Sequence, residues 1–328
     1  MELTLLTADD VRRALPMDET VAAMKAAFAA LSTGAAHQPH RMALEVPSRS
    51  GTTFIKGAAI GERGLGAKLV STFSDNPKRG LPLIHGVVIL LDPETGAPRA
   101  LIDGTFLTAW RTGAGAGAAT DLLARRDARV MALLGCGAQA GPQVLAVAAV
   151  RDLEEVRVYA RTPSSVAAFV EKMQPELAAY DCRIAAATSP AAAVRGADIV
   201  TAVTTSEVPV FDGNDLGNGV HINGVGSYTL SMREIDGISV ERSRIFVDEM
   251  TAALVEAGDL DFAVREGRTR SEEWTEIGLV AAGQAPGRRD DKETTFFKSV
   301  GVAVQDVEAA ALALERAREM GLGRTVKL

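Results

Sequence analysis

The spacing of hydrophobic residues changes along the chain and divides it into regions of different secondary structure. From Asp18 to Leu31, apolar residues recur at helical intervals until Gly34 interrupts them. Ahead of this stretch, Thr7 and Asp10 have the spacing of a capping box. The beginning of the chain is therefore predicted to be helical.

Between Arg41 and about Asp103 the pattern changes to short apolar runs separated by turns. Residues 41–46 have an alternating pattern, and turn signals follow at Ser50-Gly51, Asn76-Pro77 and Thr95-Gly96. We expect an antiparallel sheet here. A helix rich in alanine and glycine is expected next, from Leu107 to about Ala124.

After Asp127, short apolar strands alternate with helices. Strands are expected at Val130–Leu134, Val156–Tyr159, Ile199–Val203, Val220–Val225 and Ile245–Val247, with helices between them, for example at Ser164–Met173 and Pro190–Val194. This alternation predicts a parallel, doubly wound sheet. A last amphipathic helix, Ser299 to Met320, is expected to return to the N-terminal domain.

These patterns predict an α/β protein with a central parallel sheet and a second, α+β domain that is discontinuous in sequence. The expected boundaries are 1–124 for the first part of the discontinuous domain, 125–298 for the central domain and 299–328 for the returning helix. A length of 328 residues fits about two domains. With 47% hydrophobic residues, the chain can bury a sizeable core.

Composition argues against several functional classes. The longest apolar runs are far shorter than the roughly 20 residues that span a bilayer, and residues 1–4 lack the features of a secretory signal, so we expect a cytoplasmic protein with no membrane partner. Two cysteines and four histidines without metal-ligand spacing predict no metal site. A net charge of −7 with scattered basic residues predicts no nucleic-acid partner.

A dinucleotide fingerprint follows the first strand of the alternating region. The sequence Gly135-Cys136-Gly137-Ala138-Gln139-Ala140 has the form G-x-G-x-x-A, in which the glycines allow a tight turn and a close approach of the backbone to a pyrophosphate. The phosphates would lie at the N-terminus of the following helix, where free N–H groups favour negative charge. Because the motif follows a strand and opens a helix, it predicts a Rossmann domain rather than an ordinary glycine-rich turn.

The end of the second strand favours NADP(H) over NAD(H). NAD enzymes usually place an acidic residue about 20 residues beyond the fingerprint, whereas Arg161, 21 residues after Ala140, stands here beside Thr162. A guanidinium can bind the 2′-phosphate of NADP, and NAD(H) remains the alternative. Thr204, in the loop after the strand Ile199–Val203, either contacts the nicotinamide half or belongs to an ordinary polar loop.

Three cations in the first region lie among apolar or small residues, where an unpaired charge is costly: Arg41, Lys68 and Arg111. They either form separate salt bridges or converge on the carboxylate of a substrate. Composition alone does not separate these two interpretations.

Motifs along nearly the whole chain resemble the ornithine cyclodeaminase/mu-crystallin family. They recur in the family's order and spacing: Gly66-Ala67-Lys68, Gly80-Leu81-Pro82, Leu107-Thr108-Ala109-Trp110-Arg111-Thr112, Gly135-Cys136-Gly137-Ala138-Gln139 and Phe297-Lys298-Ser299-Val300-Gly301. The resemblance implies a homodimer whose discontinuous domain binds substrate and forms the dimer contact. It also implies that Arg41, Lys68 and Arg111 hold a substrate carboxylate and that His85 lies close to the substrate. The expected cofactor-binding residues are Thr112, Gly135, Gly137, Ala138, Gln139, Arg161, Thr162, Thr204, Ser299, Val300 and Gly301.

One departure from the family pattern concerns the reaction. Cyclodeaminases carry an aspartate in the turn where this chain has Tyr228, and a phenol with an ordinary pKa of about 10 cannot replace that anion at neutral pH. The chain is therefore more similar to the family's ketimine reductases. We expect NADPH-dependent reduction of Δ1-pyrroline-2-carboxylate, or its six-membered homologue Δ1-piperideine-2-carboxylate, to L-proline or L-pipecolate. Lys68, His85 and Tyr228 are the candidate catalytic residues.

Other functions remain open from the sequence. Within the family these are an alanine-type amino-acid dehydrogenase, an opine-type reductase of an acyclic imine and an ornithine cyclodeaminase. A function of another class is a non-catalytic, NADPH-dependent binding protein, because mu-crystallin-like members also serve in binding. The sequence does not determine the ring size of a cyclic substrate.

Overall fold

The computed structural model describes residues 2–327, which divide into two compact units. Unit 1 consists of Met1–Arg111 and Val302–Leu328, and unit 2 consists of Thr112–Gly301. The boundary falls within the helix α3 (Gly104–Leu123), between Arg111 and Thr112. The predicted domain ranges begin at residue 1 and end at residue 328, and these two residues lie outside the described part of the chain.

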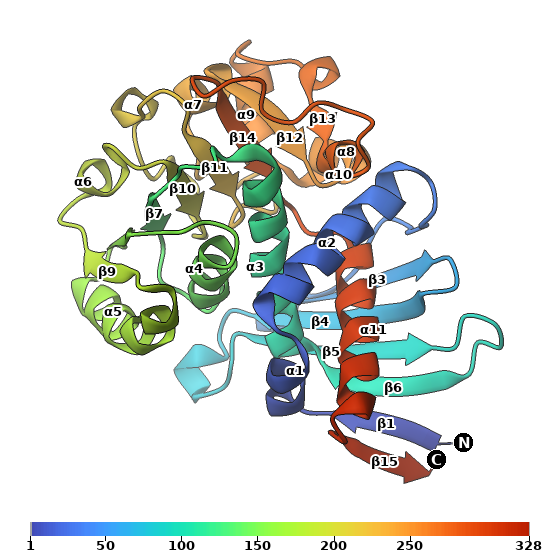
Figure 1. Cartoon of the computed structure of the whole chain (residues 1–328). Coiled ribbons are helices and arrows are strands. Elements are labelled where there is room, and N and C mark those ends of the chain that lie inside the picture. The colour runs from blue at the N-terminus through green and yellow to red at the C-terminus, as the bar shows by residue number, and fades with distance from the viewer. Residues whose placement is uncertain (1, 328) are drawn as a thin grey trace. The chain divides into compact units, whose positions relative to one another are not determined.

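Unit 1 is built on a mixed sheet (Figure 1). Within residues 2–327 the sheet has seven strands in the order β15-β1-β6-β5-β4-β3-β2. The strands are β1 (Glu2–Leu6), β2 (Met42–Val46), β3 (Gly51–Ile60), β4 (Gly64–Phe73), β5 (Ile84–Leu91), β6 (Pro98–Asp103) and β15 (Arg324–Lys327). The helices are α1 (Ala8–Ala14), α2 (Met17–Ser32) and α11 (Ala303–Glu319), in addition to the first part of α3.

Helix α11 covers one face of this sheet, because it lies across β3, β4 and β5 (Figure 1). A Cβ atom added to Gly64 would lie 2.9 Å from the side chain of Val307, so the glycine allows the helix to approach β4 closely. Residues alternate along β4, and Gly64, Gly66 and Lys68 are the buried ones. They therefore point toward α11, while Leu65, Ala67 and Leu69 point to the opposite face.

The predicted helical beginning of the chain is wrong for residues 2–6, which form β1. This strand pairs in parallel with β6 and antiparallel with β15, so its partners come from distant parts of the sequence. The capping box is present at the predicted residues, directly after β1. Thr7 Oγ1 accepts from the Asp10 amide at 3.3 Å, and the Asp10 carboxylate accepts from the Thr7 amide at 2.9 Å. Local sequence identified the start of α1 but not the strand before it.

Unit 2 is built on a second sheet, which has eight strands among the described residues, in the order β13-β12-β14-β11-β10-β7-β8-β9. The strands are β7 (Val130–Leu134), β8 (Glu155–Tyr159), β9 (Arg183–Ala186), β10 (Ile199–Ala202), β11 (His221–Gly224), β12 (Ser243–Val247), β13 (Thr275–Glu276) and β14 (Thr294–Lys298). The helices are α4 (Ala140–Ala148), α5 (Pro163–Leu177), α6 (Pro190–Val194), α7 (Gly237–Glu241), α8 (Met250–Glu256), α9 (Gly258–Arg265) and α10 (Ile277–Ala281).

All neighbouring strands of this sheet run parallel, which confirms the predicted α/β class. Every residue of β10 and β11 is buried, as is typical of strands whose two faces are both covered. The core between β7, β8 and helices α4 and α5 contains Leu133, Val144, Val158 and Phe169. A parallel sheet brings the carboxyl ends of its strands to one edge, and this edge positions the cavity described next. Among residues 2–327, no helix is long and apolar enough to cross a membrane.

Candidate active site

A cavity of about 540 Å³ lies at the carboxyl ends of β7, β8 and β10 in unit 2. Of the predicted cofactor residues, the structure brings together Gly135, Gly137, Arg161, Thr162 and Thr204 in its wall. Ala138 and Gln139 follow in the same turn and lead into α4, but they do not line the cavity. The fingerprint and the ends of the two neighbouring strands therefore share one hollow.

The fingerprint turn has the geometry that a phosphate requires. Gly135 adopts φ +105°, and a Cβ atom there would lie 2.8 Å from the Val203 carbonyl oxygen. A Cβ atom on Gly137 would meet nothing within 4 Å, so protein packing does not demand this second glycine. Helix α4 starts without a side-chain cap, which leaves N–H groups at its N-terminus for an anion. These features fit the pyrophosphate of a dinucleotide.

The far end of the cavity is formed by Tyr159, Ala160, Arg161, Thr162 and Ser165. None of the described residues that line the cavity is acidic. Arg161 is exposed and has no ion-pair partner among residues 2–327, whereas Arg157 on β8 is paired with Glu155 at 2.9 Å. The only charged side chain in the wall of this cavity, within the part of the chain described, is therefore a cation.

A buried carboxylate supports the loops that follow β10 and β11. Glu234 accepts hydrogen bonds from the backbone amides of Thr204, Gly226 and Ser227. Burial, followed by the charge of Asp259, raises the pKa of Glu234 to about 7, against the effect of Lys298. Asp259 in turn accepts from the Glu234 amide at 2.6 Å and from Lys298 Nζ at 2.7 Å. The position of Thr204 is thus fixed by interactions beneath the cavity.

A second carboxylate holds the segment 299–301 after β14. Asp248 is fully buried, and its Oδ2 accepts from the backbone amides of Val300 at 2.8 Å and Gly301 at 2.7 Å and from Ser299 Oγ at 3.1 Å. Burial raises the pKa of Asp248, although these hydrogen bonds act in the opposite direction. Thr112, another predicted cofactor residue, is half-buried within α3.

Unit 1 contains a buried cluster of charged side chains on the α11 side of its sheet. Asp306 Oδ1 accepts from Lys68 Nζ at 2.7 Å and from Arg111 Nε at 2.8 Å. Gln305 Oε1 accepts from Arg111 Nη1 at 2.8 Å, and Thr108 Oγ1 accepts from Lys68 at 3.1 Å. Two of the three predicted carboxylate-binding cations therefore meet at one aspartate of α11.

Further cations lie beside Lys68 on adjacent strands. Lys56 on β3 is opposite Lys68 on β4 and is 7% exposed. Met42 is opposite Ile55, so Arg41, one residue before β2, stands at the position opposite Lys56. The Arg41 guanidinium lies 4.6 Å from the centre of the Phe54 ring. Like charges on directly opposite residues destabilise a sheet, so this cross-strand row of Arg41, Lys56 and Lys68 is typical of a site that binds an anion.

The electrostatic setting of the cluster keeps its aspartate ionised. Burial alone would raise the pKa of Asp306, but the charges of Arg111, Lys68 and Lys56 outweigh it and hold the pKa below its usual value. Burial lowers the pKa of Lys68 to about 7, with Arg111 and Lys56 adding to the effect and Asp306 opposing it. Lys68 is therefore poised to change charge near neutral pH.

Two predicted catalytic residues are not part of this cluster. Lys68 is opposite Val88 and Ser71 is opposite His85, so the alternation along β4 and β5 directs His85 to the face opposite that of Lys68. His85 is exposed there. Tyr228 belongs to unit 2, where it is half-buried in the loop after β11.

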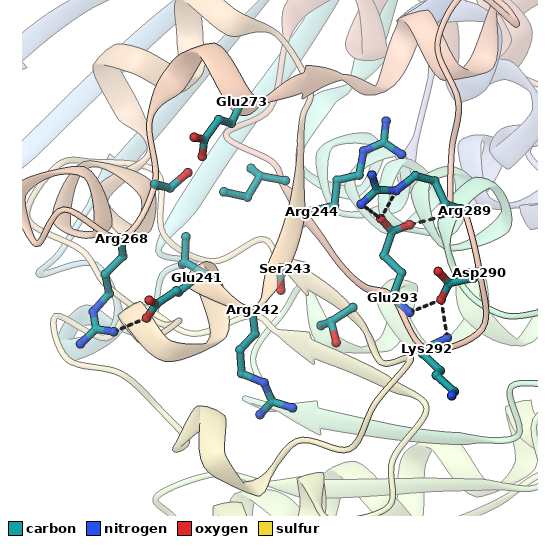
Figure 2. A pocket seen from close by; sticks show the side chains of 14 residues that line it. Glu241, Arg242, Ser243, Arg244, Arg268, Glu273, Arg289, Asp290, Lys292 and Glu293 are labelled. Carbon is teal, nitrogen blue, oxygen red and sulfur yellow. Dashed lines mark hydrogen bonds and ion pairs between the residues drawn. The ribbon is translucent and has the colours of Figure 1, made fainter.

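A second hollow in unit 2, of about 740 Å³, lies where β12 and β14 begin, at Ser243 and Thr294 (Figure 2). Charged side chains crowd its wall, but most of them bond to one another or to the backbone. Arg268 is bonded to Glu241, and Arg289 is bonded to Glu293 (Figure 2). The two remaining arginines, Arg242 and Arg244, donate to backbone carbonyls. Because ligands of such sheets bind at the carboxyl ends of strands, this hollow at the opposite edge is not the dinucleotide site.

Sequence comparison assigns these features to a family. The profile of the ornithine cyclodeaminase/mu-crystallin family matches residues 1–321. The chain belongs to this family. A family relative, the Δ1-pyrroline-2-carboxylate reductase of Bacillus cereus, is 36% identical, and the match covers 99% of this chain and 100% of that protein.

Solved structures of family members have the same fold. The Δ1-pyrroline-2-carboxylate reductase of Thermococcus litoralis, in complex with NADH and L-proline, has a TM-score of 0.94 and 36% identity, covering 99% of this chain and 100% of its own. An archaeal alanine dehydrogenase dimer with bound NAD has a TM-score of 0.91 and 32% identity, covering 100% of both chains.

Several residues of this family member were not anticipated from its sequence. Lys56 has a signal similar to that of Lys68, because each lysine lies next to apolar or small residues of its strand. Lys298 follows two phenylalanines in β14 and had a comparable signal. Gln305 and Asp306 had none, because polar residues are ordinary in an amphipathic helix and only the packing of α11 shows that its first turn is buried. Among residues 2–327, no group of three or more metal-ligating side chains is present.

Proposed function

We propose that this protein is an NADPH-dependent oxidoreductase that reduces a cyclic ketimine carboxylate. The substrates are Δ1-pyrroline-2-carboxylate and its six-membered homologue Δ1-piperideine-2-carboxylate, and the products are L-proline and L-pipecolate. The observation that carries the proposal is the buried cluster of Lys68, Arg111 and Asp306 beside Lys56, since it combines an excess of cations with one fixed carboxylate. The reductases of Bacillus cereus and Thermococcus litoralis, similar over nearly their whole length, support it.

The cations would bind the carboxylate of the substrate. Lys68 and Arg111 retain N–H groups beyond those that bond Asp306, and Arg41 stands in the same cross-strand row. Buried charges of one sign are costly unless a counter-charge is present. A bound carboxylate supplies that counter-charge and fixes the orientation of the imine carbon next to it, and orientation is a large part of the catalysis of hydride transfer.

A nicotinamide cofactor supplies the hydride when it is bound. The residues that would hold it are those of the fingerprint turn, Thr204 and the segment Ser299-Val300-Gly301, together with Thr112. We assign a preference for NADP(H) on the absence of an acidic side chain from the described cavity wall and on the unpaired Arg161. NADH and NAD are the cofactors in the two solved structures, so NAD(H) is the alternative to NADP(H). Measurements of cofactor binding have to distinguish the two.

Residue 228 separates this proposal from a cyclodeaminase. Tyr228 stands where the family resemblance places an aspartate in cyclodeaminases, so this position lacks the carboxylate that would pair with the ammonium of an amino-acid substrate. His85 and Tyr228 remain candidate catalytic residues. We favour Lys68 over His85, because His85 points to the face of the sheet opposite that of Lys68.

The proposal is tested by following the near-ultraviolet absorbance of the reduced cofactor with three substrates. We expect rapid oxidation of NADPH with Δ1-pyrroline-2-carboxylate and none with pyruvate plus ammonia. We also expect no release of ammonia from ornithine, which a cyclodeaminase would convert without a net change of the cofactor. Oxidation with pyruvate and ammonia alone would indicate an alanine-type dehydrogenase. Tight binding of NADPH without oxidation by any imine would favour a non-catalytic binding protein.

We also propose that two copies of this chain associate through the open face of the unit 1 sheet. Met42 and Leu69 are 58% and 41% exposed, and Leu101 is 37% exposed, although all three lie on a folded sheet. Met42 is opposite Ile55, Ile55 is opposite Leu69, and Leu69 is opposite Val87, so apolar residues continue across four strands. A large exposed apolar patch is typical of an interface. The solved alanine dehydrogenase of this family, with 32% identity, is a dimer, which supports a second copy as the occupant.

A further inference from the structure

The two oxygens of the Asp306 carboxylate have unequal surroundings. Oδ1 accepts from both Lys68 and Arg111. Oδ2 is buried and has no hydrogen-bond partner among the described residues. The residue itself is fully buried in the first turn of α11. One carboxylate oxygen is therefore fixed by two cations while the other is left without a donor.

The neighbouring Gln305 is also incompletely bonded. Its Oε1 accepts from Arg111 and from the amide of Val302, which fixes the orientation of the amide group. Its Nε2 is buried and has no partner among the described residues. Buried polar atoms are nearly always hydrogen-bonded, by protein, water or ligand. An unpaired donor and an unpaired acceptor on adjacent residues thus indicate a polar molecule that bonds both.

The pattern of these groups matches an α-imino acid. Lys68 has three N–H donors, of which Thr108 and Asp306 take two. The cluster thus offers donors, from Lys68 and Gln305, next to one ionised acceptor, Asp306 Oδ2. In a protonated α-imino acid, the carboxylate accepts hydrogen bonds and the adjacent nitrogen donates one. A simple carboxylate would leave Oδ2 without a donor.

We propose that Oδ2 of Asp306 accepts the hydrogen bond from the protonated nitrogen of the substrate imine, and so makes Asp306 a catalytic residue that selects an N–H donor. This inference rests on the proposed function and names the group that binds the nitrogen in it. Asp306 would favour the protonated imine because a fixed anion stabilises a nearby cation.

Apart from the hydride, which the reduced nicotinamide would supply, the reaction step needs no proton donor at this site. The imine enters with a proton on its nitrogen, and the carbon of the C=N bond accepts a hydride, which brings two electrons. The π electron pair of that bond moves onto the nitrogen, which becomes a neutral secondary amine and keeps its proton. The positive charge beside Asp306 disappears in this step, and the amine later takes a proton from water as the amino acid is released.

The test compares two flat analogues that differ only at the position of the nitrogen. Pyrrole-2-carboxylate presents an N–H group there, and furan-2-carboxylate presents an oxygen with no hydrogen. Their dissociation constants are measured by calorimetry on the full chain with NADP⁺ or NAD⁺ in excess. A hydrogen bond to a charged acceptor predicts that pyrrole-2-carboxylate binds roughly tenfold to a hundredfold more tightly.

The variant Asp306→Asn tests whether Oδ2 of Asp306 is the atom responsible for this preference. The asparagine oxygen has to accept from Lys68 and Arg111, so its NH₂ group takes the place of Oδ2 and becomes a donor. We therefore expect the preference to disappear or reverse in favour of furan-2-carboxylate. Asp198→Asn is the control, because Asp198 accepts from the backbone and from Arg125 at the amino end of β10 in unit 2. Asp198→Asn should retain the wild-type ratio of the two dissociation constants.

Each result has one meaning. Equal binding of the analogues to the wild type would show that Oδ2 holds only water and would overturn this inference, while the carboxylate site and the proposed function stand. An unchanged ratio in Asp306→Asn would also overturn it, by assigning the preference to another group. Failure of both analogues to bind would overturn the inference together with the proposed function. If Asp306→Asn does not fold, the comparison on the wild type still decides whether an N–H donor is selected.

Discussion

Lys68 carries a charge that is costly to bury and that can bind an anion. It is 1% exposed and faces another lysine directly across the sheet, yet it is bonded to a single carboxylate. Burial lowers its pKa to about 7, so a small change in its surroundings changes its charge at neutral pH. A lysine in this setting binds an anion only while it is protonated.

We therefore expect anion binding to weaken as the pH rises through about 7, because Lys68 loses its proton there. The measurement is the dissociation constant of furan-2-carboxylate, which has no group that titrates near neutral pH, between slightly acidic and alkaline buffers. In Lys68→Arg the loss should move to much higher pH, since a guanidinium keeps its proton. A flat profile in the wild type would contradict the assignment of the anion site to Lys68.

Arg111→Ala is predicted to lower kcat/KM for the cyclic imine by roughly a hundredfold or more, because it removes a cation from a buried site and leaves Asp306 with one partner. Steady-state kinetics with Δ1-pyrroline-2-carboxylate measures this effect. Arg270→Ala serves as the control, since the paired side chains of Arg270 and Glu273 are 79% and 50% exposed. Full activity of Arg111→Ala would disprove the proposed substrate site.

Arg161→Ala is expected to weaken NADPH binding by roughly tenfold or more and to leave NADH binding unchanged, because only NADPH carries the phosphate that a guanidinium would bind. Fluorescence titration of the reduced cofactors gives both constants. Arg183→Ala, at an exposed arginine of β9 that is paired with Glu155, should alter neither. An equal loss of affinity for NADPH and NADH would mean that Arg161 does not bind the 2′-phosphate.

At the scale of elements, short segments are fixed by single buried carboxylates. Asp248 bonds the segment Ser299-Val300-Gly301 after β14, and Glu234 bonds the two loops after β10 and β11. In both cases the carboxylate accepts backbone N–H groups that no strand or helix satisfies. Loss of the acceptor leaves several buried donors unpaired.

Asp248→Ala is accordingly predicted to lower the free energy of unfolding by about 3 kcal/mol, since buried N–H groups lose their acceptor. Chemical denaturation followed by circular dichroism measures the change. The matched variant Asp215→Ala breaks an ion pair with Arg195, whose side chain is 70% exposed, and should cost less than about 1 kcal/mol. A loss for Asp248→Ala no larger than that of Asp215→Ala would contradict this role.

The elements that sequence predicted well are those whose signal is local. The strand β7 and the helix α6 begin and end where the apolar pattern placed them, because flanking turns and caps limit them. The strands β1 and β15 were missed, since each is stabilised by the other and by β6 rather than by its own sequence. The strand β14 was missed because Thr294–Lys298 contains only two apolar residues, Phe296 and Phe297, between threonines and a lysine, so no continuous apolar run marks it.

The same distinction applies to the candidate site. The fingerprint glycines and Arg161 could be proposed because the spacing from a strand is a property of local sequence, and the structure places them in one cavity wall. Lys68 and Arg111 could be proposed because a cation among apolar residues is conspicuous, and the structure brings both to Asp306. Asp306 was not found, because its partners lie in β4 and α3, far away in the sequence, and only folding brings them together.

At the scale of the whole molecule, the open face of the unit 1 sheet predicts the state of association. Leu69→Glu should convert a dimer to a monomer, because it places a charge in the middle of the apolar face at a residue that is 41% exposed. Light scattering after size-exclusion chromatography measures the mass. Met320→Glu, at an exposed residue just after α11, should remain a dimer. Dimers in both variants would place the interface elsewhere.

The composition of unit 1 from both ends of the chain also sets the order of events during synthesis on the ribosome. The strands β2 to β6 are made early, but α11, which covers one face of their sheet, and β15, which pairs with β1, are made only after the whole of unit 2. A nascent chain therefore lacks the cover of α11 until residues 303–319 have been made. Without α11, Lys56 and Lys68 would be in contact with water, and their charges would oppose aggregation of the unfinished sheet.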